Sequence, residues 1–195
     1  MRCQVSYDRQ TAKMFRKDAV MTLDEAKEFY FRYNGYAFHM DREEPRTYAA
    51  FKQLEISSDT LREWDEELLE GLFETLESGN ENVWAAHGNI LKIIARNRCD
   101  TAGFLLRLLD AMEGMDSLDP SVLTLIIENM AGRNASMNDG GVYLICRYTP
   151  YALRMDATMH RLIDACSASC KEDDRAKRAA QSYIRAYDRW KNGYR

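Results

Sequence analysis

The sequence predicts an all-α protein built from antiparallel helical hairpins. Three observations support this fold class. The 195 residues include only three prolines and ten glycines, and both residue types disfavour helix interiors. Apolar residues recur at intervals of three and four in several long segments, which is the period of an amphipathic helix. Most of these segments begin at a residue that caps helices well. We expect the hairpins either to stack as a short α-solenoid or to pack as an irregular orthogonal bundle.

The composition narrows the class of protein further. Hydrophobic residues make up 46% of the chain and charged residues 30%, which is typical of a globular domain. No window approaches the roughly 18 uncharged apolar residues of a membrane helix, so we expect no membrane partner. The first residues lack an apolar signal segment, and the five cysteines are scattered without a Cys-x-x-Cys pair. These features predict reduced cysteines and a cytoplasmic protein.

We expect residues 1–20 to form a basic N-terminal arm and residues 21–195 to form a single all-helical domain. The sequence Thr22-Leu23-Asp24-Glu25 is a capping box that begins a helix. Asn34-Gly35 supplies the left-handed residue that ends it. Phe29, Tyr30 and Phe31 are consecutive and fan across roughly 200° of this helix. One contact face cannot hold all three rings, so either two neighbours flank the helix or some aromatic surface is left for a partner.

The clearest hairpin spans residues 59–97. A short apolar segment and a proline-initiated helix from Pro45 to about Leu54 precede it. Ser58 or Asp59 should cap its first helix, which runs to about Glu77. Its buried stripe should comprise Leu61, Trp64, Leu68, Leu72 and Leu76. Between these positions, the opposite and solvated face is acidic and comprises Glu63, Asp65, Glu66, Glu67, Glu70 and Glu74. The second helix should begin at Asn80 or Asn82 and bury Val83, Ala86, Ile90 and Ile94.

Further helices are expected from their start signals. The predicted ranges are about 101–113 after an Asp100 cap, 120–134 after Asp119, a short helix from Asp139, 150–168 and 175–192. In the first of these the inward positions should be Ala102, Leu105, Leu106, Leu109 and Met112. The helix over 175–192 closes the chain.

The helix starts recur along the chain. Asp59, Asp100 and Asp139 are separated by 41 and 39 residues, and Val83 and Val122 by 39. The repeat-like units would span about 59–97, 100–134 and 139–168. This period and the sequence Asn82-Val83-Trp84-Ala85-Ala86 resemble HEAT and armadillo repeats in architecture. The resemblance implies a HEAT-like α-solenoid over roughly residues 59–167 and carries no activity. The alternative is a coincidence among helices of average length in an irregular bundle.

No catalytic or cofactor motif is present. The sequence lacks the Gly-x-Ser-x-Gly, phosphate-loop and His-Glu-x-x-His signatures. His87 lies on a buried helix face and is expected to be a core histidine with a hydrogen-bond partner. His39, in an aromatic segment, is the better candidate for a site. Cys166 and Cys170 are four residues apart, but no second cluster accompanies them, so we expect neither a metal nor a cofactor.

The charge is unevenly distributed along the chain. Residues 41–82 contain 13 acids and 4 bases, whereas residues 171–195 contain 8 bases and 4 acids. In the last helix, an arginine ridge follows steps of three, seven and four and comprises Arg175, Arg178, Arg185 and Arg189. The ridge either docks on nucleic acid or an acidic protein, or its arginines are solvated or paired with acids of the same chain.

These observations leave three hypotheses for function. The first is a non-enzymatic protein that binds another protein through an aromatic and acidic surface. That surface would comprise Tyr30, Tyr33, Tyr36, His39, Glu63, Glu67, Glu70 and Glu74. The second is a nucleic-acid-binding protein that uses the arginine ridge, which the overall pI of about 5.5 disfavours. The third is an enzyme with an unidentified site in a groove. The oligomeric state is left open, with a homodimer as one option.

Overall fold

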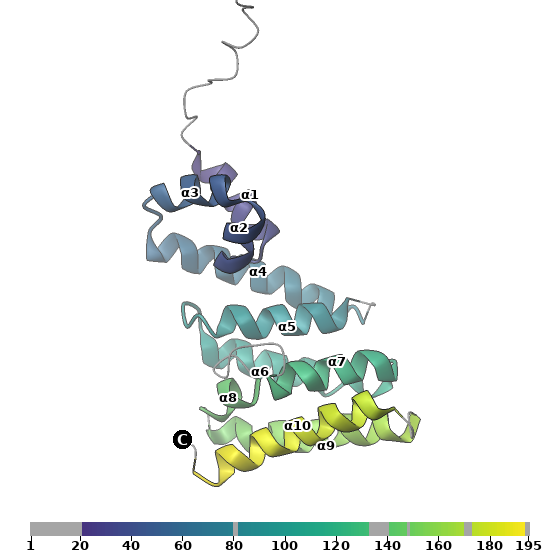
Figure 1. The fold of residues 1–195 in the computed structure, drawn as a ribbon. Coiled ribbons are helices and arrows are strands. Elements are labelled where there is room, and N and C mark those ends of the chain that lie inside the picture. Colours follow the sequence, from purple (N-terminus) through teal and green to yellow (C-terminus); the bar gives the residue numbers. More distant parts are fainter. Residues whose placement is uncertain (1–20, 80–81, 133–140, 148, 170–172, 194–195) are drawn as a thin grey trace, which may run out of the picture. The chain divides into compact units, whose positions relative to one another are not determined.

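The structure, a computed structural model, describes residues 21–79, 82–132, 141–147, 149–169 and 173–193. Every regular element within these ranges is helical, which confirms the all-α prediction (Figure 1). The predicted N-terminal arm lies outside the described residues. The α-helices are α1 (Leu23–Arg32), α2 (Ala37–Glu43), α3 (Pro45–Gln53), α4 (Ser58–Glu77), α5 (Val83–Ile94), α6 (Thr101–Met112), α7 (Pro120–Ala131), α8 (Gly141–Cys146), α9 (Thr149–Ser169) and α10 (Asp174–Lys191). A short 3₁₀ turn, Met115–Ser117, lies between α6 and α7.

The chain divides into two compact units, Met1–Glu55 and Ile56–Arg195. The first contains α1 to α3, and the second contains α4 to α10. The organisation of residues 21–195 as one domain stays a prediction.

In the first unit, the helix boundaries follow from local capping. The Glu25 amide donates to the Thr22 hydroxyl oxygen at 3.2 Å, and the Thr22 amide donates to the Glu25 carboxylate at 2.8 Å. This reciprocal pair is the predicted capping box. After α1, Asn34 and Gly35 have φ values of 48° and 63°, so the left-handed stop is also confirmed. Pro45 is the first residue of α3, as expected for a residue that has no amide hydrogen to leave unpaired.

Aromatic rings join α1 to α3 within this unit. The Phe29 ring centroid lies 5.8 Å from that of Phe51, and the Tyr30 ring stacks on Phe51 at 6.1 Å. Tyr48 stacks on the same ring at 6.3 Å. These separations are in the range of favourable ring pairs. Two of the three consecutive aromatic residues of α1 therefore pack inside the first unit.

The second unit begins with α4 and α5, which pack closely against each other. The side chain that caps α4 is Ser57, whose hydroxyl oxygen accepts from the Thr60 amide at 3.0 Å. The prediction that Ser58 or Asp59 caps this helix was wrong. Of the predicted stripe, Trp64, Leu68 and Leu76 are buried, but Leu61 and Leu72 are only half-buried, and the remaining buried apolar positions are Leu69 and Phe73. The buried face is thus wider than one line of leucines, because α4 contacts α6 as well as α5. All four predicted core residues of α5 are buried: Val83, Ala86, Ile90 and Ile94.

The caps of α6 and α7 are as predicted. An Asp100 carboxylate oxygen accepts from the Gly103 amide at 3.1 Å, and Asp119 accepts from the Ser121 amide at 2.8 Å. One inward prediction in α6 was wrong, because Leu106 is exposed whereas Leu105 is fully buried. The core side of α6 extends instead over Leu108, which is also fully buried.

The remaining helices of the second unit extend from α7. This helix contacts α5 on one side and α9 and α10 on the other, and α8 packs on α7, α9 and α10. Figure 1 shows α5, α6 and α7 between α4 and α10. Ion pairs link helices that are not adjacent in the sequence: Arg107 of α6 pairs with α4, Arg154 of α9 pairs with α6, and Arg175 of α10 pairs with α7. The two helices α4 and α10 thus lie on opposite sides of the same packed core.

The predicted repeat stays a prediction. The first helices of its first two units begin at Ser58 and Thr101, and the second helices at Val83 and Pro120. These separations are unequal, and α4 has 20 residues whereas α6 has 12. The third start, Asp139, lies outside the described residues. None of the described helices is long and apolar enough to cross a membrane.

Candidate interaction surfaces

The aromatic segment of the first unit divides into core and surface. Tyr30 is 3% exposed and stacks on Phe51, so it does not contribute to a binding surface. Tyr33 is half-buried, and its hydroxyl donates to the Glu44 carboxylate at 3.0 Å. Burial, followed by this hydrogen bond, raises the pKa of the Tyr33 hydroxyl. Tyr33 therefore helps to hold α1 next to the start of α3.

The outward part of the segment is a cluster on α2, which we call the aromatic cluster: Tyr36, Phe38 and His39. Phe38 is 61% exposed and Tyr36 40%. The His39 ring lies 5.0 Å from Tyr36 and 5.6 Å from Phe38, centroid to centroid. The Tyr36 and Phe38 rings are 6.3 Å apart. The three rings thus form one contiguous aromatic surface.

Charged side chains border the aromatic cluster. The Arg42 guanidinium lies 5.5 Å from the centroid of the Phe38 ring and 3.3 Å from His39 Nδ1. It also pairs with Glu43 at 2.8 Å. The hydrogen bond from Arg42 lowers the pKa of the Glu43 carboxyl. An apolar centre with an adjacent arginine is the composition that protein interfaces favour.

The acidic prediction for α4 holds for some residues and not for others. Glu63, Glu67 and Glu74 are exposed. Glu70 is exposed too, but it accepts from Arg107 at 2.7 Å. The same arginine binds Glu77 at 3.1 Å and lies 4.3 Å from the centroid of the Phe73 ring. Glu70 thus belongs to a bridge between α4 and α6.

Asp65 corrects the prediction of a uniformly solvated acidic face. Its side chain is fully buried, and one carboxylate oxygen accepts from Arg96 Nη1 at 2.5 Å. Arg98 lies 3.7 Å from the other oxygen. Two arginines just after α5 therefore compensate the buried charge, which would otherwise be very unfavourable. Periodicity placed Asp65 between the acids, but the pairing depends on residues some thirty positions later.

The arginine ridge of α10 also divides into two parts. Arg175 Nε and Nη2 donate to the two carboxylate oxygens of Glu128 at 3.0 and 2.8 Å. Glu128 is buried in α7, so this bidentate pair joins the two helices. It also raises the pKa of the Arg175 guanidinium. Arg175 is therefore a packing residue, as the alternative reading of the ridge predicted.

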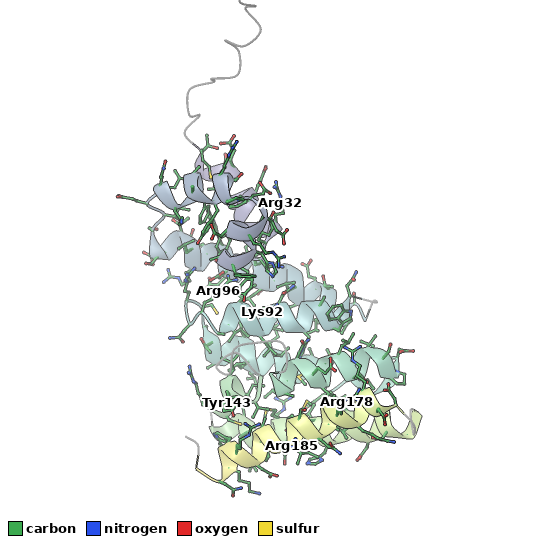
Figure 2. The ribbon with its side chains drawn as sticks, viewed as in Figure 1. Arg32, Lys92, Arg96, Tyr143, Arg178 and Arg185 are labelled. Atoms are coloured by element: carbon green, nitrogen blue, oxygen red, sulfur yellow. The ribbon has the colours of Figure 1, made fainter. Side chains whose placement is uncertain are left out.

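The other three arginines, Arg178, Arg185 and Arg189, are exposed. Arg185 contacts Gln181 of its own helix at 3.4 Å, and Arg189 Nε donates to the Arg185 carbonyl oxygen at 3.1 Å. None of the three forms an ion pair with a carboxylate of the described part of the chain. Figure 2 shows Arg178 and Arg185 on α10. We call these three residues the arginine row.

His87 is in the core, as predicted, but without the expected hydrogen-bond partner. The side chain is 0% exposed, and neither ring nitrogen has a partner among the described residues. Burial lowers the pKa of His87 to about 4, so the ring is neutral at physiological pH.

No group of three His, Cys, Asp or Glu side chains that could hold a metal ion occurs in the described ranges. Burial raises the pKa of the Cys99 thiol to about 11 and that of Cys146 to about 12. These two thiols are therefore protonated and weak nucleophiles. Cys166 is buried beside the Thr124 hydroxyl, at 3.4 Å. Cys170, the other half of the cysteine pair, lies outside the described residues.

Phe38 lies within the aromatic segment to which the sequence assigned a surface, but it was not among the residues named for that surface. The segment Tyr36–Met40 is too short and too uniformly apolar to show which rings face outward. The helical geometry of α2 buries Met40 and exposes Phe38, since residues two positions apart point about 200° apart.

Comparison of the chain with protein-family models, with curated proteins and with solved structures found no match.

Proposed function

We propose that this chain is a non-enzymatic helical protein that binds another protein through the aromatic cluster of α2. The observation that carries the proposal is the exposure of two large rings, Phe38 and Tyr36, next to His39 and Arg42. Exposed single apolar residues are common, but three contiguous rings with an adjacent guanidinium resemble the centre of a binding hot spot.

The partner that fits this cluster presents an apolar side chain on a polar segment. The rings would contact that side chain, while Arg42 and Glu43 would contact polar groups at the margin. The acidic residues of α4 belong to the second unit, so the proposal uses the aromatic cluster alone. Tyr30 and Tyr33 support the unit from inside and take no part in contact with the partner.

Two variants of the full-length chain test the proposal. Phe38→Ala combined with Tyr36→Ala should weaken capture of a partner by about tenfold or more, the loss expected for hot-spot residues. Leu153→Ala is the matched control, because Leu153 is a 77% exposed apolar residue on α9. A photo-crosslinking residue in place of Phe38 would identify the captured protein.

Thermal unfolding distinguishes a binding surface from a core. Because Phe38 and Tyr36 are exposed, the double variant should melt close to the wild type. Equal capture by the wild type and the double variant would contradict the proposal. So would a loss of capture that Leu153→Ala reproduces.

A further inference from the structure

We infer that the arginine row of α10 binds the acidic face of α4 in a second copy of this chain, so that copies associate head to tail. This inference concerns only the second unit and is independent of the proposed function of α2. It rests on three properties of the two helices: complementary charge, matched spacing and placement on opposite sides of one core.

The first property is charge. Of the eight acids of α4, Asp65 is buried against Arg96, and Arg107 binds Glu70 and Glu77. The outer face takes its negative charge from exposed acids that include Glu63, Glu67 and Glu74. The arginine row forms no ion pair with a described carboxylate, as shown above. Two exposed helix faces of opposite sign on the same molecule attract each other between copies.

The second property is spacing. Counted from the C-terminal end of α10, Arg185 lies four positions before Arg189, and Arg178 lies seven positions before Arg185. Along α4, Glu67 follows Glu63 by four positions and Glu74 follows by seven more. At about 1.5 Å per residue, both rows have separations of about 6 Å and 10 Å. At about 100° per residue, each row occupies an arc of only about 40°.

Antiparallel packing therefore brings three pairs into register. Arg189 would face Glu63, Arg185 would face Glu67, and Arg178 would face Glu74. A parallel arrangement also matches, with Glu70 in place of Glu67. Both arrangements place Glu63 and Glu74 opposite the two outer arginines of the row, Arg178 and Arg189, so the inference depends on these four exposed residues.

The third property is placement. Within the second unit, α4 packs on α5 and α6, whereas α10 packs on α7, α8 and α9. The two rows therefore lie on opposite sides of one core and cannot pair with each other in the same copy. Pairing between copies leaves one acidic and one basic face unused at the two ends. Such a heterologous contact propagates rather than closing as a symmetric dimer.

The association should be weak and sensitive to salt, because exposed ion pairs are individually small and screened. In sedimentation velocity at about 50 mM salt, the weight-average sedimentation coefficient of the full-length chain should rise with protein concentration. At about 1 M salt, where charges are screened within about 3 Å, that rise should vanish. The protein is treated with nuclease beforehand, and its absorbance ratio is checked for bound nucleic acid.

Charge reversal tests the pairing. Arg178→Glu combined with Arg189→Glu reverses the charge at both ends of the arginine row, and Glu63→Lys combined with Glu74→Lys reverses it at the two positions of α4 that face them. Each double variant alone should stay monomeric at low salt. An equimolar mixture should associate again, because the glutamates introduced on α10 of one variant then meet the lysines introduced on α4 of the other. Only this pattern, in which both double variants are monomeric and their mixture associates, supports the inference.

A matched control tests which face of α10 takes part in the association. Lys177 and Lys191 are exposed on the same helix but lie about 100–140° around α10 from the arginine row. Lys177→Glu combined with Lys191→Glu changes the net charge equally and should keep the wild-type association. Loss of association in this control would overturn the assignment of the contact to the arginine row. A wild type that is monomeric at low salt would overturn the inference, and so would a mixture of the two double variants that stays dissociated. Retention of nucleic acid through Arg178 and Arg189 would then assign the arginine row to a polyanion.

Discussion

At the scale of single residues, His87 is the most consequential. Its imidazole is fully buried, and neither nitrogen has a hydrogen-bond partner in the described part of the chain. A buried polar group without a partner costs roughly 1–3 kcal/mol. Protonation would add a desolvated charge to this cost, which is why the pKa of His87 falls to about 4 in the folded protein.

The lowered pKa predicts a specific pH dependence of stability. The unfolded chain binds a proton at His87 below its ordinary pKa of 6.5, whereas the folded chain does so only below about 4. Above pH 6.5, protonation of His87 therefore does not affect the free energy of unfolding. As the pH falls from 6.5 towards 4, the unfolded chain takes up this proton first, and the free energy of unfolding decreases. The total loss should be about 3 kcal/mol, because each pKa unit corresponds to about 1.4 kcal/mol. Urea unfolding across this pH range measures it.

Carboxylates also titrate in this range, so the comparison needs a variant that removes only the buried proton site. His87→Leu should flatten the pH dependence between 6.5 and 4. His160→Gln is the matched control, because His160 is exposed. A pH dependence that His87→Leu leaves unchanged would contradict the assignment.

At the scale of elements, α10 carries two kinds of arginine. Arg175 makes two hydrogen bonds to the buried carboxylate of Glu128. Arg178, less than one turn later, is exposed and makes no such pair. The helix thus uses its first arginine to hold α7 and leaves the arginine row outside.

This division predicts unequal effects of two similar substitutions. Arg175→Ala removes two charge-assisted hydrogen bonds to the buried Glu128 carboxylate and should lower the free energy of unfolding by about 1–3 kcal/mol at neutral pH. Arg178→Ala should change it by less than about 0.5 kcal/mol, as surface substitutions usually do. Chemical denaturation of both variants measures the difference. Equal effects would mean that the pair with Glu128 contributes nothing to stability.

At the scale of the whole molecule, the chain consists of two compact units that meet in sequence at residues 55 and 56. The second unit contains the fully buried leucines and isoleucines, among them Leu69, Ile90, Leu105, Leu109 and Ile126. At 140 residues, Ile56–Arg195 is long enough to bury a core of its own.

We therefore predict that residues 56–195 fold without residues 1–55. The fragment should keep a helical circular dichroism spectrum and a single cooperative thermal transition. Loss of cooperativity in the fragment would favour the single domain over residues 21–195 that the sequence predicts. The full-length chain, measured in parallel, provides the reference transition.

The sequence by itself determined the local features of this protein. The capping residues Thr22, Asp100 and Asp119, the left-handed stop at Asn34-Gly35 and the buried face of α5 were all predicted. These features depend on residues within one or two helical turns, and their physical causes are hydrogen bonds and helical periodicity. The all-α class follows from the same local signals.

Only the tertiary structure decided which side of each helix is covered and which charges are paired. Leu105 and Leu106 are adjacent leucines, yet one is buried and the other exposed, because the width of a buried face depends on its neighbouring helices. Asp65 and Arg175 likewise differ from their sequence neighbours only through distant partners, Arg96 and Glu128. Contacts between residues thirty or more positions apart leave no periodic signal in the sequence, so only the structure separates Asp65 from the exposed acids of α4 and Arg175 from the arginine row.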